Sequence, residues 1–197
     1  LINEPTAAAM AYGLGKEGQE VIAIYDFGGG TFDISILDVD RNTFEVLTSH
    51  GDTTLGGEDI DILLLDKLAN AFHEEHDVDL RDDPMSYHRL KEAAEKAKCE
   101  LSTMERTRVN LPFIAYRDKE PLHLDMTLTR DDFEQMIEPL VERTIQISKR
   151  AIKEAGLKPT EINKVILVGG SSRIPLVEEL VGEFFDQDPF KGVHPDE

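Results

Sequence analysis

The stretch DFGGGTFD, from Asp26 to Asp33, places a run of glycines between two acidic residues. Successive N–H groups of glycine and threonine can form a concave nest that binds an anion such as phosphate. Carboxylates beside such a nest suit the Mg²⁺ ion that accompanies a phosphate. The alternative is a plain β-hairpin whose turn uses glycine for positive φ angles. A two-residue turn needs fewer glycines, but the residues alone leave both interpretations open. The stretch is not a Walker A loop, because it lacks Gly-Lys-Ser/Thr.

A second glycine pair, Gly169 and Gly170, follows the apolar run VILV and precedes Ser171, Ser172 and Arg173. Glycines at the end of a buried strand let a ligand approach the backbone closely, and either serine can cap a following helix. An ordinary strand-to-helix turn explains the same residues.

A third candidate is a helix face over 84–102. Lys91, Glu95, Lys98 and Ser102 are spaced four, three and four residues apart, so they share one side of a helix. They form either a solvated face with Lys91–Glu95 and Glu95–Lys98 ion pairs, or part of a binding site. The spacing does not decide between the two.

Hydrophobic periodicity predicts the elements that position these residues. Alternating or continuous apolar runs predict strands near 21–27, 32–39, 44–49, 108–114, 121–128 and 164–168. Apolar residues at three-four spacing predict helices over 58–75, 84–102, 130–155 and 174–185. Pro5, a run of alanines and a final Gly13 predict a short helix over 4–13. We expect Thr129 to cap the helix over 130–155, Pro139 to bend or restart it and Gly156 to end it. We expect a turn at 40–42 and a solvated acidic loop at 73–83.

Composition limits the classes of function. The net charge of −19 would repel nucleic acids and anionic membranes, so we expect neither as a partner. No apolar run approaches the ~20 residues of a membrane-spanning helix. The single cysteine excludes an internal disulfide and fits a reducing compartment. Because the chain starts at Leu1 rather than at a methionine, we expect it to be a piece of a longer protein.

The chain resembles the DnaK-type seventy-kilodalton heat-shock chaperones in five stretches that occur in the family's order and spacing. These are INEPTAAAMAYGL (2–14), DFGGGTFDISIL (26–37), GDTTLGGEDID (51–61), KEAAEKAKCELS (91–102) and VILVGGSSRIPLV (165–177). The resemblance covers essentially the whole chain and matches lobe II, the second half of the family's nucleotide-binding ATPase domain. It implies the actin-like, hexokinase-like α/β ATPase fold, with a mixed five-stranded sheet flanked by helices. The implied parts are a crossing helix at 1–14, a base subdomain at 15–55 and 138–197, and an inserted upper subdomain at 56–137.

Carried over position by position, the resemblance implies binding of ATP/ADP, Mg²⁺ and K⁺. Asp26 and Glu4 resemble acids that hold magnesium through its waters. Asp33 resembles the acid that positions the attacking water and binds potassium. Thr31 matches a threonine near the γ-phosphate that can be autophosphorylated in bacterial and organellar members. The implied nucleotide-binding residues are Gly28, Gly29, Gly30, Thr31, Gly57, Glu58, Glu95, Lys98, Cys99, Ser102, Gly169, Gly170, Ser171, Ser172, Arg173 and Asp196.

Three positions depart from the family's common pattern. Cys99 stands where many eukaryotic cytosolic members have arginine, so the pocket resembles bacterial or mitochondrial forms. We therefore expect the bacterial cytoplasm or, alternatively, the mitochondrial matrix. His194 replaces the asparagine usual before Pro-Asp-Glu, next to the implied site residue Asp196, and Phe27 replaces a leucine.

The implied function is that of the ATP-binding lobe of a molecular chaperone, in which ATP hydrolysis drives cycles of unfolded-peptide binding and release. We expect the full-length parent to be an ATPase and this chain alone to lack hydrolysis. The implied partners are a nucleotide-exchange factor on 56–137, a J-domain co-chaperone and unfolded polypeptides. Two alternatives stay open: a docking module for co-chaperones, or a relative of actin and the sugar kinases. The stretches EAAEKAKCELS and INEPTAAA argue against that relative.

Overall fold

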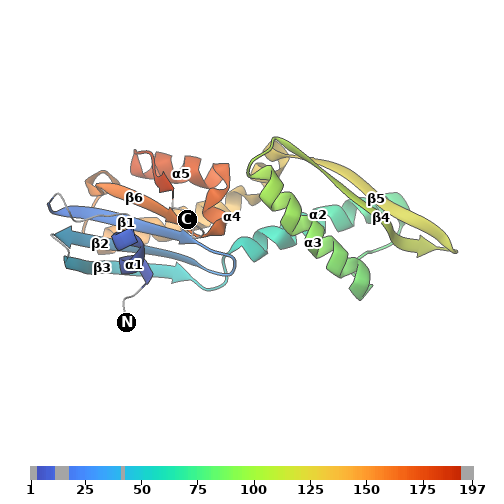
Figure 1. Ribbon diagram of the computed structural model, residues 1–197, viewed down its shortest axis with the longest axis horizontal. Coiled ribbons are helices and arrows are strands. Elements are labelled where there is room, and N and C mark those ends of the chain that lie inside the picture. Colours follow the sequence, from blue (N-terminus) through green and yellow to red (C-terminus); the bar gives the residue numbers. More distant parts are fainter. Residues whose placement is uncertain (1–3, 12–17, 41–42, 192–197) are drawn as a thin grey trace. The chain divides into compact units, whose positions relative to one another are not determined.

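Figure 1 shows a computed structural model of the chain, which describes residues 4–11, 18–40 and 43–191. The chain divides into two compact units. Unit 1 comprises Leu1–Gly57 and Pro139–Glu197, and unit 2 is the continuous segment Glu58–Glu138. Within the described ranges, no helix is long and apolar enough to cross a membrane.

Unit 1 is built on a mixed five-stranded sheet, as the family resemblance implied. The strand order is β3-β2-β1-β6-β7, in which β1, β2 and β3 are antiparallel neighbours, whereas β6 runs parallel to β1 and β7 parallel to β6. The strands are β1 (Glu20–Phe27), β2 (Phe32–Asp40), β3 (Thr43–Asp52), β6 (Lys164–Val168) and β7 (Phe190–Lys191). The third strand continues to Asp52, beyond the predicted end at residue 49.

Both faces of this sheet are covered because its central strands alternate two sets of apolar side chains. On one face, helix α1 (Glu4–Ala11) packs Ala9 against a buried cluster of Ile22, Ile24, Leu37, Val39 and Ile166. On the other face, the hydroxyl groups of Tyr25 and Thr144 of helix α4 (Arg130–Glu154) lie 2.5 Å apart in the buried interior. Each fully buried large side chain contributes roughly 1.5–3 kcal/mol.

Helix α4 follows the predicted capping pattern but not the predicted break. The N–H of Asp132 donates to Oγ1 of Thr129 at 3.2 Å, which caps the helix. Gly156, with a φ of +72°, takes the left-handed conformation that ends it. The helix runs without interruption through Pro139, so the prediction of a restart there is wrong. Unit 1 also contains η1 (Pro159–Glu161), η2 (Gly170–Arg173) and α5 (Pro175–Phe185).

Unit 2 contains two helices and a two-stranded hairpin: α2 (Gly57–His76), α3 (Pro84–Leu101), β4 (Arg106–Arg117) and β5 (Glu120–Thr129). Asp83 caps α3 by accepting from the N–H of Ser86 at 2.8 Å. The hydroxyl of Ser86 also donates to the carbonyl of Ile114 at 2.8 Å, which ties the start of α3 to β4. The hairpin has a register shift around residue 113, where Phe113 adopts a φ of +54°.

The acidic run 73–83 is more ordered than predicted. Its first four residues complete α2, and Leu80 is fully buried. Arg81 donates to Asp79, Asp66 and Asn70 at 2.8–2.9 Å. The run is therefore a folded connection and not a solvated loop throughout. The predicted turn at 40–42 and the helix end at Gly13 fall partly or wholly outside the described residues.

Candidate functional site

The loop 28–31 joins β1 to β2 and exposes its backbone. The N–H of Gly28 donates to the carbonyl of Thr31 at 3.0 Å, which closes the turn. Gly29, Gly30 and Thr31 are exposed, and no group in the described part of the chain accepts from their N–H groups. Three successive N–H groups on one exposed loop can receive an anion.

The hairpin alternative explained the glycines in this loop by positive φ angles, and that explanation is wrong. None of Gly28, Gly29 and Gly30 has a left-handed φ. A Cβ added at Gly29 or Gly30 would meet no atom within 4 Å. Neither the backbone conformation nor the described neighbours require glycine at 29 and 30, so their effect is to leave open space in which a ligand can approach the backbone.

Neighbouring segments hold the loop in place through its backbone. The carbonyl of Gly28 accepts from the N–H of Gly57 at 2.9 Å and from Oγ of Ser171 at 3.0 Å. Gly56 is buried against the loop, so closely that a Cβ on it would overlap the carbonyl group of Gly29. These contacts fix the backbone of loop 28–31.

Two carboxylates flank loop 28–31 on the strands that it joins. Asp26 and Asp33 are register partners on β1 and β2, and both line a cavity of about 260 Å³ on the face covered by α1. The remaining lining residues are Pro5, Ala8, Ile24, Ser35, Ser49 and Val168. The Oγ atoms of Ser35 and Ser49 lie 3.0 Å apart there. The cavity therefore presents oxygen ligands from several strands at one place.

This donor set fits Mg²⁺. The ion is usually held by one or two carboxylates together with water and substrate phosphates, not by a full cage of side chains. Among the described residues, no group of three or more His, Cys, Asp or Glu side chains forms such a cage. The side chain of Glu4, the third acid predicted for the metal, lies outside the described part of the chain.

The second glycine pair packs against the end of β1. Gly169 has a φ of +87°, and a Cβ on it would overlap the carbonyl of Phe27 and lie 2.7 Å from Oδ1 of Asp26. The predicted serine cap of the following helix is wrong. Oγ of Ser171 donates to Gly28, and Oγ of Ser172 donates to the carbonyl of Gly169 at 2.6 Å. Ile174 occupies the N-cap position of α5, and no side chain caps the helix there.

The predicted helix face lies on α3 in unit 2. Glu95 and Cys99 are exposed, whereas Lys98 is mostly buried. Oγ of Ser102 donates to the carbonyl of Lys98 at 3.0 Å. The predicted Lys91–Glu95 and Glu95–Lys98 ion pairs are absent from the described residues.

Lys98 pairs instead with Asp61 of α2, at 2.8 Å between Nζ and Oδ2. Burial raises the pKa of Asp61, and the nearby Glu95 and Glu58 raise it further, while Lys98 acts against them. Oδ1 of Asp61 is buried and has no hydrogen-bond partner within the described residues. The pair holds the ammonium group of Lys98 beside α2.

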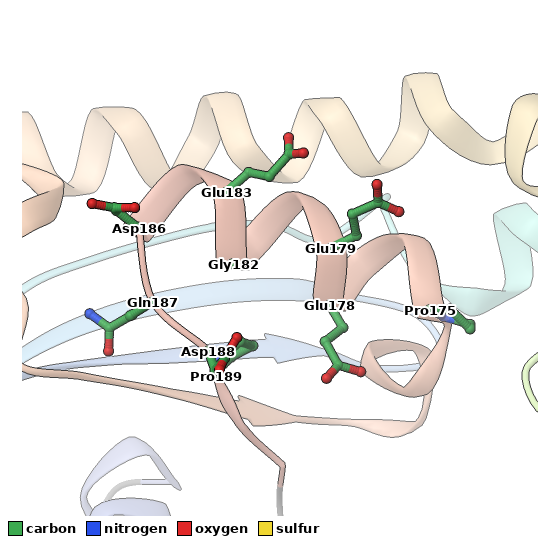
Figure 2. Close-up of a pocket in the computed structure, with 9 residues that line it drawn as sticks. All are labelled: Pro175, Glu178, Glu179, Gly182, Glu183, Asp186, Gln187, Asp188 and Pro189. Atoms are coloured by element: carbon green, nitrogen blue, oxygen red, sulfur yellow. The ribbon is translucent and has the colours of Figure 1, made fainter.

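Unit 1 also has a larger hollow, of about 660 Å³, along α5 and the turn that follows it. Its acidic residues are Glu178, Glu179, Glu183, Asp186 and Asp188. Figure 2 shows these carboxylates spread along the helix instead of converging on one point. Glu178 pairs with Lys191 at 2.8 Å, and no residue predicted for nucleotide or metal lines this hollow. The cavity lined by Asp26 and Asp33 is therefore the better candidate for a catalytic site.

The predicted site residues fall in both units. Asp26, loop 28–31 and Asp33 come together in unit 1 with Gly57 and the segment 169–172, and Arg173 is exposed at the end of η2. Unit 2 contains the α3 residues and Glu58, which is exposed in the first turn of α2. Asp196 lies outside the described residues.

Three residues at these sites were not predicted from the sequence. Gly51 and Gly56 lie against Asp33 and loop 28–31, respectively, and Asp61 holds Lys98. The glycines gave a weak signal, because both belong to one glycine-containing stretch. Asp61 gave no local signal, because its partner is 37 residues away.

One comparison with known proteins bears on these sites: the family model of the Hsp70 protein matches residues 1–197, the full length of the chain. Hsp70 proteins are chaperones with ATPase activity that bind ATP or ADP with Mg²⁺ and work with co-chaperones and client polypeptides. The mixed sheet and its flanking helices agree with the actin-like ATPase fold of this family. The chain therefore belongs to the Hsp70 family.

Proposed function

We propose that this chain is lobe II of the ATPase domain of a DnaK-type member, with unit 2 as the inserted upper subdomain. In this proposal, loop 28–31 and the acids Asp26 and Asp33 receive the phosphates and metal of ATP. The main support is their arrangement: two opposed carboxylates line one cavity at the base of an exposed loop with three successive N–H groups that donate to no described residue. Such a loop supplies donors to phosphate, while the acids supply ligands to a cation.

The chemistry is phosphoryl transfer to water, which depends mainly on positioning and charge stabilisation. Bound Mg²⁺ would offset the negative charge of the phosphates. Asp26 and Glu4 would hold that ion, and Asp33 would orient the attacking water and contribute to a K⁺ site. Thr31 would lie near the γ-phosphate, where its exposed hydroxyl could accept a phosphoryl group.

The adenosine contacts stay predictions for residues of each unit. In unit 2, these residues are Glu58 of α2 and the predicted residues of α3. Asp61 of α2 holds one of them, Lys98, in place. In unit 1, the exposed guanidinium of Arg173 is available to stack on a base. Cellular location also stays a proposal, with the bacterial cytoplasm favoured over the mitochondrial matrix.

Asp33→Asn in the full-length parent tests the proposed role of the hairpin. Removing the charge at nearly constant size should slow single-turnover ATP hydrolysis about 100-fold, in the range of a lost acid–base or positioning group. ATP affinity should change by less than about threefold, because the loop N–H groups remain.

The matched control is Asp40→Asn, an exposed acid at the far end of the same strand. It should leave both quantities unchanged. An unchanged hydrolysis rate in Asp33→Asn would contradict the proposal.

A second proposal concerns partners: we propose that unit 2 docks a nucleotide-exchange factor, whereas a J-domain co-chaperone and unfolded polypeptides act on the full-length parent. The supporting observation is that the hairpin β4–β5 exposes two large aromatic side chains, Phe113 at 57% and Tyr116 at 63%. Exposed aromatic residues are common anchors of protein interfaces.

Titration calorimetry of the chain with its cognate exchange factor tests this docking. The double variant Phe113→Ala/Tyr116→Ala should bind at least about tenfold more weakly, a loss of about 1.4 kcal/mol. Met10→Ala removes an exposed apolar side chain from unit 1 and should not change the affinity. Equal affinities for all three proteins would exclude the hairpin as the docking site.

A further inference from the structure

One row of residues crosses the sheet at the base of loop 28–31. Val168, Asp26, Asp33 and Gly51 are successive register partners on β6, β1, β2 and β3, which are neighbours in Figure 1. Register partners direct their side chains to the same face of a sheet. Asp33 therefore has a carboxylate on one side and a glycine on the other.

The side chain of Asp33 occupies the space that a side chain at residue 51 would need. A Cβ added at Gly51 would overlap Oδ1 of Asp33 and lie 3.1 Å from its Cγ. The backbone of Gly51 is not left-handed, so its conformation does not require glycine. The requirement is one of space: the carboxylate of Asp33 is turned toward β3, over the α-carbon of Gly51.

An orientation toward β3 lowers the repulsion between the two acids. Like charges directly opposite each other on antiparallel strands repel, and the repulsion grows as the distance between them falls. Strand β2 lies between β1 and β3, so a carboxylate of Asp33 over Gly51 is on the side of β2 away from Asp26. Residue 51 leaves that space open because it has no side chain, and both acids line one cavity.

We propose that Gly51 is a positioning residue: it sets the orientation of the Asp33 carboxylate and acts on ATP hydrolysis only through it. This inference rests on the proposed function of the hairpin. A competing explanation is purely structural, because the added Cβ would also lie 2.8 Å from the carbonyl oxygen of Phe32. That contact would shift the backbone whether or not Asp33 had a carboxylate.

A double-mutant cycle separates the two explanations. Gly51→Ala is made in the wild-type full-length protein and in the Asp33→Ala variant, which has no carboxylate to displace. Urea unfolding of all four proteins gives a readout that does not depend on ATP. Gly51→Ala should lower stability in both backgrounds, and should raise the unfolding equilibrium constant at least about tenfold more in the wild-type background than in Asp33→Ala. Equal losses in both backgrounds would assign the overlap to the Phe32 carbonyl and overturn the proposal.

Single-turnover hydrolysis supplies the second readout. Gly51→Ala should lower the rate of ATP hydrolysis at least about tenfold while the ATP affinity changes by less than about threefold. An unchanged rate would overturn the role of Gly51 even if the stabilities were coupled. If wild-type protein neither bound nor hydrolysed ATP, the proposed function would fail instead, and the stability cycle would still report on the geometry.

Two further variants keep the test decisive. If Gly51→Ala does not fold, folding of Gly51→Ala/Asp33→Ala would support the proposal, and its failure to fold would overturn it. Gly182→Ala adds a Cβ within α5 of the same unit, where the nearest atom is at 3.4 Å. It should show no coupling to Asp33→Ala and an unchanged hydrolysis rate.

Discussion

Loop 28–31 in unit 1 and loop 77–83 in unit 2 are both held by hydrogen bonds, but in different ways. Loop 28–31 is fixed through backbone groups and by the close approach of Gly56. Loop 77–83 is fixed through side chains, since Arg81 donates to Asp79, Asp66 and Asn70. The same guanidinium lowers the pKa of Asp79 to about 2.

The difference shows how a loop becomes available to a ligand. The polar side chains of loop 77–83 pair with one another and with Asp66 and Asn70 of α2. A loop held by its backbone and by glycines keeps its other N–H groups and the space above them open. We therefore expect changes in loop 28–31 to affect ligand binding and stability together, and changes in loop 77–83 to affect stability alone.

The largest effect is expected from Gly169→Ala. The left-handed φ and the overlap with the Phe27 carbonyl should cost about 3 kcal/mol of unfolding free energy. The displaced end of β1 carries Asp26, so the affinity for Mg·ADP should fall at least about tenfold in the full-length parent. Urea unfolding and calorimetry measure the two effects.

The neighbouring glycine supplies the stability control. A Cβ at Gly170 would meet no atom within 4 Å, and its φ is not left-handed. Gly170→Ala should therefore change the unfolding free energy by less than about 0.5 kcal/mol. Equal stabilities of the two variants would show that the approach of Gly169 to β1 is not required.

A smaller effect is expected from Arg81→Ala, which should lower the unfolding free energy by less than Gly169→Ala does, because several charge-assisted hydrogen bonds are lost. The Arg81 side chain is 32% exposed, and solvent screening keeps the loss modest. Arg81→Lys should recover less than half of it, since an ammonium cannot reproduce the planar fork. Affinity for Mg·ADP should stay unchanged. A tenfold weaker affinity would remove the distinction between the two loops.

Much of the fold could be predicted from the sequence because its signals are local. Apolar residues at three-four spacing gave α2 and α3 to within two residues. Apolar runs gave every strand of the main sheet except β7, and Thr129 and Gly156 gave the ends of α4. A restart at Pro139 was wrongly predicted, because an intact helix can tolerate a proline when its other contacts hold.

The candidate site could be predicted only as far as residue types allowed. The acids and glycines of 26–33 stood out together in the sequence. The neighbours of that stretch did not, because Gly51, Gly56 and Ser171 matter through contacts that only the folded sheet creates. The two serines illustrate this limit, since their type suggested a helix cap while the fold directs Ser171 to loop 28–31.

The parallel pairing of β1 with β6 has a consequence for how the chain acquires its structure. Ile22 pairs in register with Lys164, 142 residues later, whereas unit 2 is one continuous segment with its own hairpin and helices. Pairings between residues far apart in sequence form slowly, because the intervening chain must first lose its freedom. During synthesis, unit 2 is complete before the last strands of unit 1 leave the ribosome. The half-formed sheet must meanwhile keep one side of β1 unpaired, so the segment that carries the candidate site stays exposed to misfolding until β6 has been made.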